Sequence, residues 1–137
     1  MSKIDKLYYD SGELQGVTYR NDSGEYHREG GPAFISYYKD GSVECEVYWL
    51  NGGRHRTDGP AAISYNEDGS ISVEEYYVND KRHRTDGPAY ISYYEDGSVY
   101  YKEYYINSRR ATKEQIEEIQ FNQQFDKDLE EVLLWAR

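Results

Sequence analysis

The chain repeats itself at a fixed interval, and this regularity constrains its fold more than any single residue does. The interval is the one that separates His27 from His55 and His55 from His83. Three short motifs recur at that spacing: His-Arg pairs beginning at those histidines, Gly-Pro-Ala triplets beginning at Gly31, Gly59 and Gly87, and Asp-Gly-Ser triplets beginning at Asp40, Asp68 and Asp96. A fixed period of this length is typical of stacked repeats, in which each unit buries its apolar face only against its neighbours. The sequence therefore predicts an array of three repeat units.

Each unit contains the pattern of a β-hairpin. Its first arm, over 33–37, 61–65 and 89–93, places Ala, Ile and Tyr at alternate positions, while the residues between them vary. A period of two is typical of a strand with two distinct faces. We expect the Ala, Ile and Tyr side chains to face the core, and intervening residues such as Phe34 and Tyr90 to face outward.

The turns and second arms complete the hairpins. An Asp-Gly pair follows each first arm, which favours a hairpin turn because glycine accepts the positive φ that the turn requires. Second arms are expected over 43–50, 71–78 and 99–106. In the first of these the apolar positions change parity, which predicts a bulge or a change of packing near Glu46 and Val47. A partial N-terminal unit is expected around residues 8–14, with a one-residue slip.

The segment after Ala111 departs from the repeat and has the pattern of a helix. Thr112 followed by Gln115 has the sequence of a capping box, and residues 112–137 contain neither glycine nor proline. Because a stack of hairpins ends in an open sheet edge, we expect residues 112–137 to pack on the end of an array formed by residues 1–111.

The apolar residues of this segment do not share one helical face. Those from Phe125 onward lie on one side, whereas Ile116 and Ile119 fall on another when they are placed at 100° per residue. The sequence therefore predicts either a break near Asp126 or a helix that bends around a corner of the array.

Charge and cysteine content limit the classes of partner. A formal net charge of −10 over 137 residues repels DNA, RNA and anionic lipid, so neither direct nucleic-acid binding nor membrane binding is expected. The sequence has no apolar run typical of a secretion signal or of a membrane span. Cys45 is the single cysteine, which suits a reducing compartment. We expect a single-domain cytoplasmic protein.

The repeat motif resembles a known family. The pattern Asn-Gly-x-x-His-Arg-x-Asp-Gly-Pro-Ala spans Asn51 to Ala61, and it recurs from Asn79 to Ala89 with Asp80 in place of glycine. Over about residues 20 to 111 this is similar to the variant class of MORN (membrane occupation and recognition nexus) repeats. The resemblance implies a non-catalytic scaffold or partner-binding module, and for a small acidic example a phage or viral accessory protein that binds and blocks a host defence factor.

No catalytic or metal site is predicted. Equivalent positions in successive hairpins lie about 10 Å apart, too far for the histidines to share an ion with ligand bonds of about 2 Å. Cys45 has no counterpart, since Val73 and Tyr101 occupy its place in the other units, and the serines lie at regular strand positions rather than in a strained elbow. We therefore expect a protein that is not an enzyme and that uses no cofactor.

The His-Arg-x-Asp residues are instead expected to be structural. An Arg–Asp pair beside a tight Gly-Pro bend can fix the turn and satisfy loose backbone groups. The predicted structural set is His27, Arg28, His55, Arg56, Asp58, His83, Arg84 and Asp86.

Partner binding is expected on the outer, serine-lined face and on a basic rim beside it. Aromatic and arginine side chains are the usual anchors of protein interfaces. The candidate residues are Phe34, Tyr38, Trp49, Arg54, Arg82, Arg84, Tyr90, Tyr94 and Tyr100.

The leading hypothesis is therefore a non-enzymatic protein-binding module, which the resemblance narrows to a phage-encoded inhibitor of a host defence protein in the host cytoplasm. Two alternatives stay open: an acidic nucleic-acid mimic that occupies a DNA- or RNA-binding cleft of a host enzyme, and a structural scaffold or lipid-associated repeat protein. A homodimer, joined edge to edge or through the tyrosine-rich face, is also an open alternative.

Overall fold

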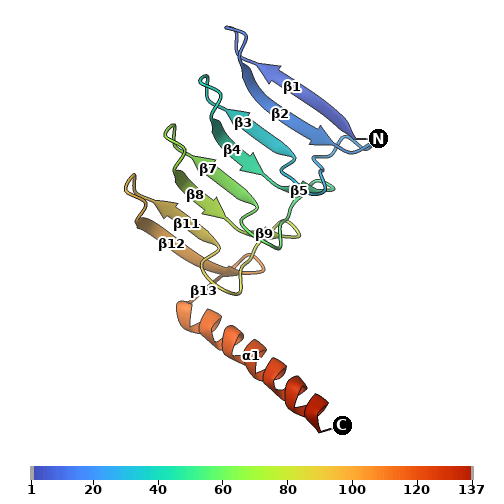
Figure 1. Cartoon of the computed structure of the whole chain (residues 1–137), viewed down its shortest axis with the longest axis vertical. Coiled ribbons are helices and arrows are strands. Elements are labelled where there is room, and N and C mark those ends of the chain that lie inside the picture. The colour runs from blue at the N-terminus through green and yellow to red at the C-terminus, as the bar shows by residue number, and fades with distance from the viewer. Residues whose placement is uncertain (1, 137) are drawn as a thin grey trace.

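A computed structural model describes residues 2–136 and shows a mainly β protein with one C-terminal helix (Figure 1). The elements in chain order are β1 (Lys3–Tyr8), β2 (Leu14–Arg20), β3 (Phe34–Tyr37), β4 (Val43–Val47), β5 (Trp49–Leu50), β6 (Gly53–Arg54), β7 (Ala62–Tyr65), β8 (Ile71–Glu75), β9 (Tyr77–Val78), β10 (Lys81–Arg82), β11 (Tyr90–Tyr93), β12 (Val99–Ile106), β13 (Arg109–Ala111) and α1 (Lys113–Trp135). The predicted β-hairpin array with a C-terminal helix is confirmed.

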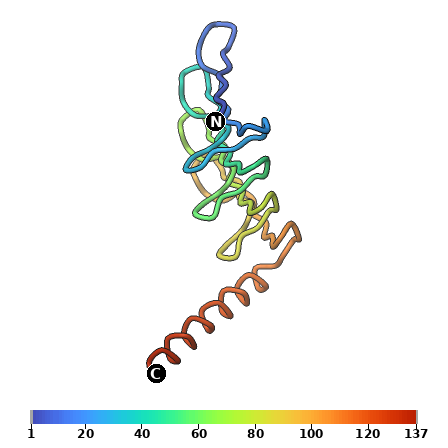
Figure 2. The backbone as a smooth tube through the Cα atoms, turned by 90° about the vertical axis from the view of Figure 1, so that its right-hand side faces the viewer, coloured from blue at the N-terminus to red at the C-terminus, as the bar shows by residue number. Residues whose placement is uncertain are grey.

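Nine strands form one antiparallel sheet in the order β1-β2-β3-β4-β7-β8-β11-β12-β13. Four long hairpins succeed one another, β1–β2, β3–β4, β7–β8 and β11–β12, and the second arm of each pairs with the first arm of the next. In the side view the hairpins follow one another along a single direction, and the helix leaves from the last of them (Figure 2).

The core is thin and lies on the predicted face. Ala33, Ala61 and Ala89 have no exposed surface, and Ile63 and Ile91 are also buried. The alanines are small because the chain passes close to the neighbouring hairpin at these points: Ala61, for example, donates its N–H to the carbonyl of Glu75. The predicted core face of Ala, Ile and Tyr positions is confirmed for these alanines and for Ile63 and Ile91, while Ile35 and the three tyrosines of the series are only half-buried.

The change predicted near Glu46 and Val47 is present as a break in the second arm at Tyr48, the residue after Val47. It is not a bulge, because Glu46 and Val47 pair regularly and the register shift lies between Ser36 and Tyr37, at the turn end of the hairpin. At Tyr48 the N–H still donates to the carbonyl of Ala61, in line with the β4–β7 register, whereas the C=O of Tyr48 accepts the N–H of His55 from the segment that follows. This break explains the change of parity in the sequence.

Beyond the break, the chain forms a miniature hairpin in each unit: β5–β6, β9–β10, and β13 paired with the end of β12. Their two-residue turns have positive φ at both central positions, for example 47° at Asn51 and 80° at Gly52. Such turns match the twist of short hairpins and favour Asn-Gly. The sequence indicated the turn but not the strands on either side of it.

The N-terminal unit is a full hairpin. Tyr9 donates its N–H to the carbonyl of Glu13, as Tyr38 does to Ser42, so Tyr9 and Tyr38 occupy equivalent positions. The spacing of these two tyrosines exceeds the repeat interval by a single position, which is the one-residue slip that the sequence showed.

Helix α1 begins at the predicted residue. Thr112 is its N-cap, and the capping box with Gln115 is present. The helix runs without interruption, so the predicted break near Asp126 is wrong. No glycine, proline or inserted side chain interrupts its backbone bonds.

Only the start of α1 contacts the array. Ile116, 2% exposed, is the one buried residue of the helix, and the rest projects away from the sheet (Figure 1). The expectation that the whole segment packs on the array end therefore holds for its first turns alone, and Arg137 lies outside the described residues. The later turns do not pack on the sheet because their apolar residues, from Phe125 onward, lie on a different side of the helix from Ile116. No helix among the described residues combines the length and apolar character needed to cross a membrane.

Candidate interaction surface

An arginine–tyrosine stack joins each unit to the next. The guanidinium carbons of Arg28, Arg56 and Arg84 lie 4.0, 4.1 and 4.0 Å from the ring centres of Tyr19, Tyr48 and Tyr76. Each guanidinium also donates to the carbonyl of the proline four residues later, at 3.2, 3.0 and 3.1 Å. These contacts give the arginine of the His-Arg pair a structural role.

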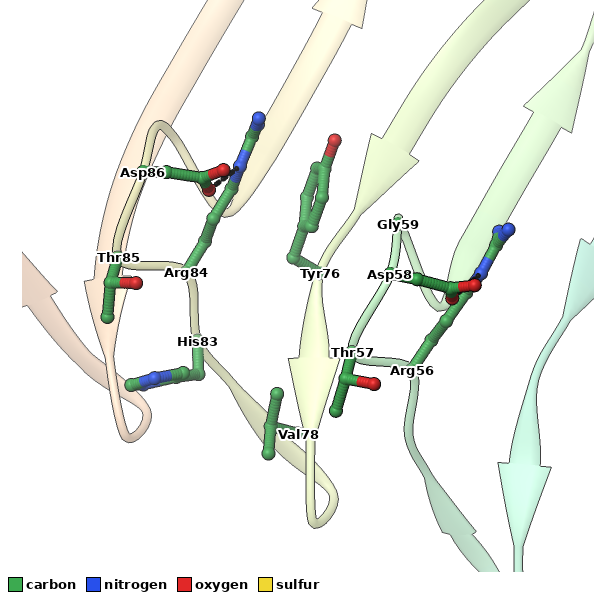
Figure 3. Close-up of a pocket in the computed structure, with 10 residues that line it drawn as sticks. All are labelled: Arg56, Thr57, Asp58, Gly59, Tyr76, Val78, His83, Arg84, Thr85 and Asp86. Carbon is green, nitrogen blue, oxygen red and sulfur yellow. Dashed lines mark hydrogen bonds and ion pairs between the residues drawn. The ribbon is translucent and has the colours of Figure 1, made fainter.

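The aspartate of the motif completes the bend in two units. The Nε of Arg56 donates to Asp58 at 2.9 Å, and that of Arg84 donates to Asp86 at 2.8 Å (Figure 3). The first unit has Glu29-Gly30 in place of Thr-Asp, and Gly30 has a φ of 79° there.

The histidines connect successive units rather than sharing a metal. The Nδ1 atoms of His27, His55 and His83 accept the backbone N–H of Asn51, Asn79 and Asn107 at 3.0, 3.0 and 3.1 Å. Acceptance at Nδ1 requires the neutral imidazole with its proton on Nε2. Within residues 2–136, no group of three His, Cys, Asp or Glu residues is placed to hold an ion.

Between neighbouring bends lie two equivalent clefts of about 550 and 410 Å³. The larger is lined by Thr57, Tyr76, Val78, His83 and Thr85 together with the two Arg–Asp pairs (Figure 3). The two arginines and two aspartates of this cleft form two ion pairs, so their charges balance within it. It contains threonine hydroxyls but no strained elbow or paired base that would activate one.

The opposite face carries a different arrangement, which we call the aromatic–arginine ladder. It comprises Arg20, Tyr26, Phe34, Trp49, Arg54, Tyr77, Arg82, Tyr90 and Tyr105. Its arginine and aromatic side chains contact one another from unit to unit, and Arg54, 5.9 Å from the ring centre of Trp49, joins its two parts into one surface.

The first part of the ladder is built around Tyr26. Arg20 lies 4.4 Å from the ring centre of Tyr26, and this ring lies 5.3 Å from Trp49 and 6.5 Å from Phe34. Rings at these separations attract one another in edge and tilted geometries.

The second part is built around Tyr77, which is 6% exposed. The guanidinium of Arg54 lies 4.0 Å from the Tyr77 ring centre, and that of Arg82 lies 5.6 Å from it. Arg82 also lies 5.3 Å from Tyr90 and 5.1 Å from Tyr105. Tyr77 is therefore held between two cations at the centre of the array.

Carboxylates fix the two central arginines. Arg54 donates to Asp80 at 2.9 Å, and Arg82 donates to Glu75 at 3.1 Å. Asp80 occupies the position of Gly52 in the preceding turn, and its side chain explains why a residue with φ of 61° is not glycine there. Since these side chains are already immobilised, a partner that contacts them would lose little rotamer entropy on binding.

The structure brings together five of the nine predicted partner-binding residues: Phe34, Trp49, Arg54, Arg82 and Tyr90. The other four lie apart. Arg84 belongs to the stack on Tyr76, Tyr38 donates its hydroxyl to the carbonyl of Tyr65 at 2.7 Å, and Tyr94 and Tyr100 form an exposed pair with ring centres 4.9 Å apart.

Four members of the ladder were not predicted: Arg20, Tyr26, Tyr77 and Tyr105. Two of them could have been predicted from the repeat, because Tyr77 and Tyr105 occupy the position of Trp49 in the next two units. Arg20 and Tyr26 have no equivalent of the same type in the other units, so only the fold shows their position.

Neither a family model, nor a curated protein, nor a solved structure matches this chain. The resemblance to MORN repeats therefore stays a prediction.

Tyr65 and Tyr93, on the stack side, have the most strongly raised pKa values among the tyrosines described. Burial, followed by the hydrogen bond that its hydroxyl donates to Glu46 at 2.9 Å, raises the pKa of Tyr65 to about 12. Burial and the hydrogen bond to Glu74 likewise raise the pKa of Tyr93. A raised phenol pKa means that the fold favours the neutral hydroxyl, so this contribution to stability is complete below pH 10 and is lost as the pH rises toward 12.

We expect Tyr65 and Tyr93 to ionise at higher pH than ordinary tyrosines in an alkaline titration that follows phenolate absorption. The wild-type chain should show tyrosines that ionise together with alkaline unfolding. Glu46→Gln removes the nearby charge and should bring the ionisation of Tyr65 to lower pH, whereas Tyr65→Phe should remove that late component. Identical titration curves for the wild type and both variants would contradict this assignment.

Proposed function

We propose that this protein is a non-enzymatic protein-binding module that contacts its partner through the aromatic–arginine ladder. The observation that carries the proposal is the ladder itself, a surface of rings and guanidinium groups that is continuous over several units and held in place by its own ion pairs. Aromatic and arginine side chains in preorganised positions are the residues that dominate binding energy at protein interfaces.

The reactive groups of the chain support a binding role over catalysis. Cys45 is partly buried in the sheet, and its burial raises the pKa of the thiol, which disfavours the nucleophilic thiolate. Each histidine nitrogen Nδ1 is used in a backbone hydrogen bond.

The resemblance to variant MORN repeats suggests a specific case of this proposal: a phage-encoded inhibitor that binds a host defence protein in the host cytoplasm. This case predicts that the captured partner is a host protein and that the bound partner loses its activity.

The test is affinity capture from host lysate with matched variants, read by quantitative mass spectrometry. A true partner should be captured by the wild type and by Tyr8→Ala, which removes an exposed aromatic ring far from the ladder. Its capture should fall about ten-fold or more with Trp49→Ala and with Tyr90→Ala, as expected when a hot-spot aromatic is truncated. Far-UV circular dichroism checks that each variant folds.

Capture that is equal for all four proteins would reject the ladder as the binding site. Loss that accompanies unfolding of both ladder variants would show that these rings serve the fold and not a partner.

One observation favours the acidic-mimic alternative. The acidic side chains of α1 are all exposed: Glu114, Glu117, Glu118, Asp126, Asp128, Glu130 and Glu131. A mimic of nucleic acid would bind with a steep salt dependence and would be displaced by DNA. An anchor site built on aromatic rings requires neither behaviour, so the same captured partner distinguishes the two functions.

A further inference from the structure

The last long strand of the sheet has an open edge. Strand β12 pairs with β11 over its first part and with β13 only over Tyr104–Ile106. On the side away from β11, no strand among residues 2–136 pairs with residues 99–103. Val99, Tyr100 and Tyr101 are correspondingly exposed, and α1 does not cover them.

The equivalent edge is filled three times inside the same chain. Strand β2 receives β3, strand β4 receives β7, and strand β8 receives β11. At the last of these junctions Glu74 lies opposite Ile91, and Val73 lies opposite Ser92. One repeat interval further along the chain, Lys102 occupies the position of Glu74, and Tyr101 occupies that of Val73.

The backbone of β12 is oriented to continue this ladder. Tyr48 and Tyr76 donate their N–H groups to the carbonyls of Ala61 and Ala89 in the next unit. Tyr104 is the following residue of this series, and N–H directions alternate along a strand. The N–H and C=O groups of Lys102, two residues earlier, therefore face the open edge.

A second copy of this chain does not fit the edge in the register of the repeat. In a second copy, the strand with a free edge that corresponds to a first arm is β1. If Tyr9 takes the position that Tyr38 has in its own unit, Lys6 would lie opposite Lys102 and Asp5 opposite Glu103. Like charges directly opposite one another destabilise a strand pair. The two ends of the array are thus mismatched, which opposes growth into a filament.

We propose that the β12 edge over residues 99–103 binds an extended segment of another protein, which adds a strand to the sheet. By repeat equivalence this segment resembles the first arms of the chain: a small or aromatic residue opposite Glu103, an aliphatic residue opposite Lys102, and a serine or similar small residue opposite Tyr101. The positive charge of Lys102 also favours an acidic residue opposite it. Main-chain hydrogen bonds supply the affinity of such strand addition, and the alternating side chains supply its specificity.

The proposal is independent of the ladder, because it uses the edge of the sheet and not its face. The expected occupant is a strand of another protein. The filled junctions β4–β7 and β8–β11 show which kind of strand this edge accepts, and the charges of β1 oppose pairing with a second copy of the chain.

The test uses a synthetic peptide with the sequence of residues 87–94, which contains β11, added to the full chain. Isothermal titration calorimetry should detect binding, and hydrogen exchange should show new protection of the Lys102 amide. A peptide with Ile91→Lys places a second ammonium opposite Lys102 and loses the apolar contact, so it should bind about ten-fold more weakly or worse. A peptide with Ile91→Glu should bind more tightly than the lysine peptide.

Protein variants locate the site. Lys102→Pro removes the outward N–H and should abolish binding, whereas Lys6→Pro, the same change on the other free edge, should leave it intact. Proline is tolerated on an edge strand where its missing N–H faces solvent. If Lys102→Pro fails to fold, the comparison of the three peptides on the wild-type chain decides.

Three results would overturn the proposal. They are absence of peptide binding, equal affinity for the Ile91→Lys and unmodified peptides, and a wild-type dimer in analytical ultracentrifugation that Lys102→Pro dissociates. The last would show that a second copy occupies the edge in another register.

Discussion

Replacing Tyr77 with alanine is expected to lower the free energy of unfolding by about 3–5 kcal/mol, the usual cost of emptying a buried aromatic site. Tyr77 is the most buried aromatic residue among those described, and it separates the guanidinium groups of Arg54 and Arg82. Its removal would leave a cavity and two arginines without their ring. Because typical domains are stable by only about 5–15 kcal/mol, urea unfolding followed by circular dichroism should show a large shift of the midpoint.

Tyr77→Phe is the matched control for this prediction. It keeps the ring and loses only the hydrogen bond that Arg82 donates to the hydroxyl at 3.1 Å. A net loss of about 0.5–1.5 kcal/mol is expected for one hydrogen bond. If Tyr77→Ala costs no more than Tyr77→Phe, the ring does not contribute to the core as the structure indicates.

Replacing Arg56 with alanine is expected to be the next most damaging change, at about 2–3 kcal/mol. One guanidinium here stacks on Tyr48, donates to the carbonyl of Pro60, and pairs with Asp58. Its loss removes all three contacts, which hold one bend against the preceding hairpin. Thermal and urea unfolding of the purified variant measure the effect.

Two substitutions separate the contributions of Arg56. Arg56→Lys keeps the positive charge but not the flat, forked group that stacks and donates in two directions, so it should recover little of the loss. Asp58→Ala should cost about 0–1 kcal/mol, as for other exposed pairs, because the Asp58 side chain is 83% exposed. A lysine variant as stable as the wild type would mean that charge alone matters at this position.

The hairpins could be predicted from the sequence because their determinants are local. Asp-Gly at residues 40–41, 68–69 and 96–97 fixes the turns, and alternation in the first arms fixes the faces. The start of the helix was equally local, since Thr112 and Gln115 form their capping box within one turn. The path of the helix could not be predicted in this way, because it depends on contacts between the helix and the sheet and not on local sequence.

The interaction surface was only half predictable, for a related reason. Trp49 and Tyr90 stand out by residue type and by their outward parity, whereas Tyr26 joins the ladder through a loop whose course the repeat does not specify. The hydrogen bonds from the asparagine turns to histidine Nδ1 connect residues 24 positions apart, and no local pattern indicates them. The sequence predicted that the histidines lie in a bend, but it did not predict that they accept hydrogen bonds from the neighbouring unit.

The contacts that join successive units have a consequence for how such a chain can change in length. The arginine stack and the histidine bond each connect a residue to the neighbouring unit and to nothing further away. Excising residues 57–84 would join Arg56 directly to Thr85 and restore the same sequence across the join, and duplicating them would do the same. Whole periods are therefore interchangeable modules, so that evolution or a protein engineer could lengthen the array without redesigning its interior.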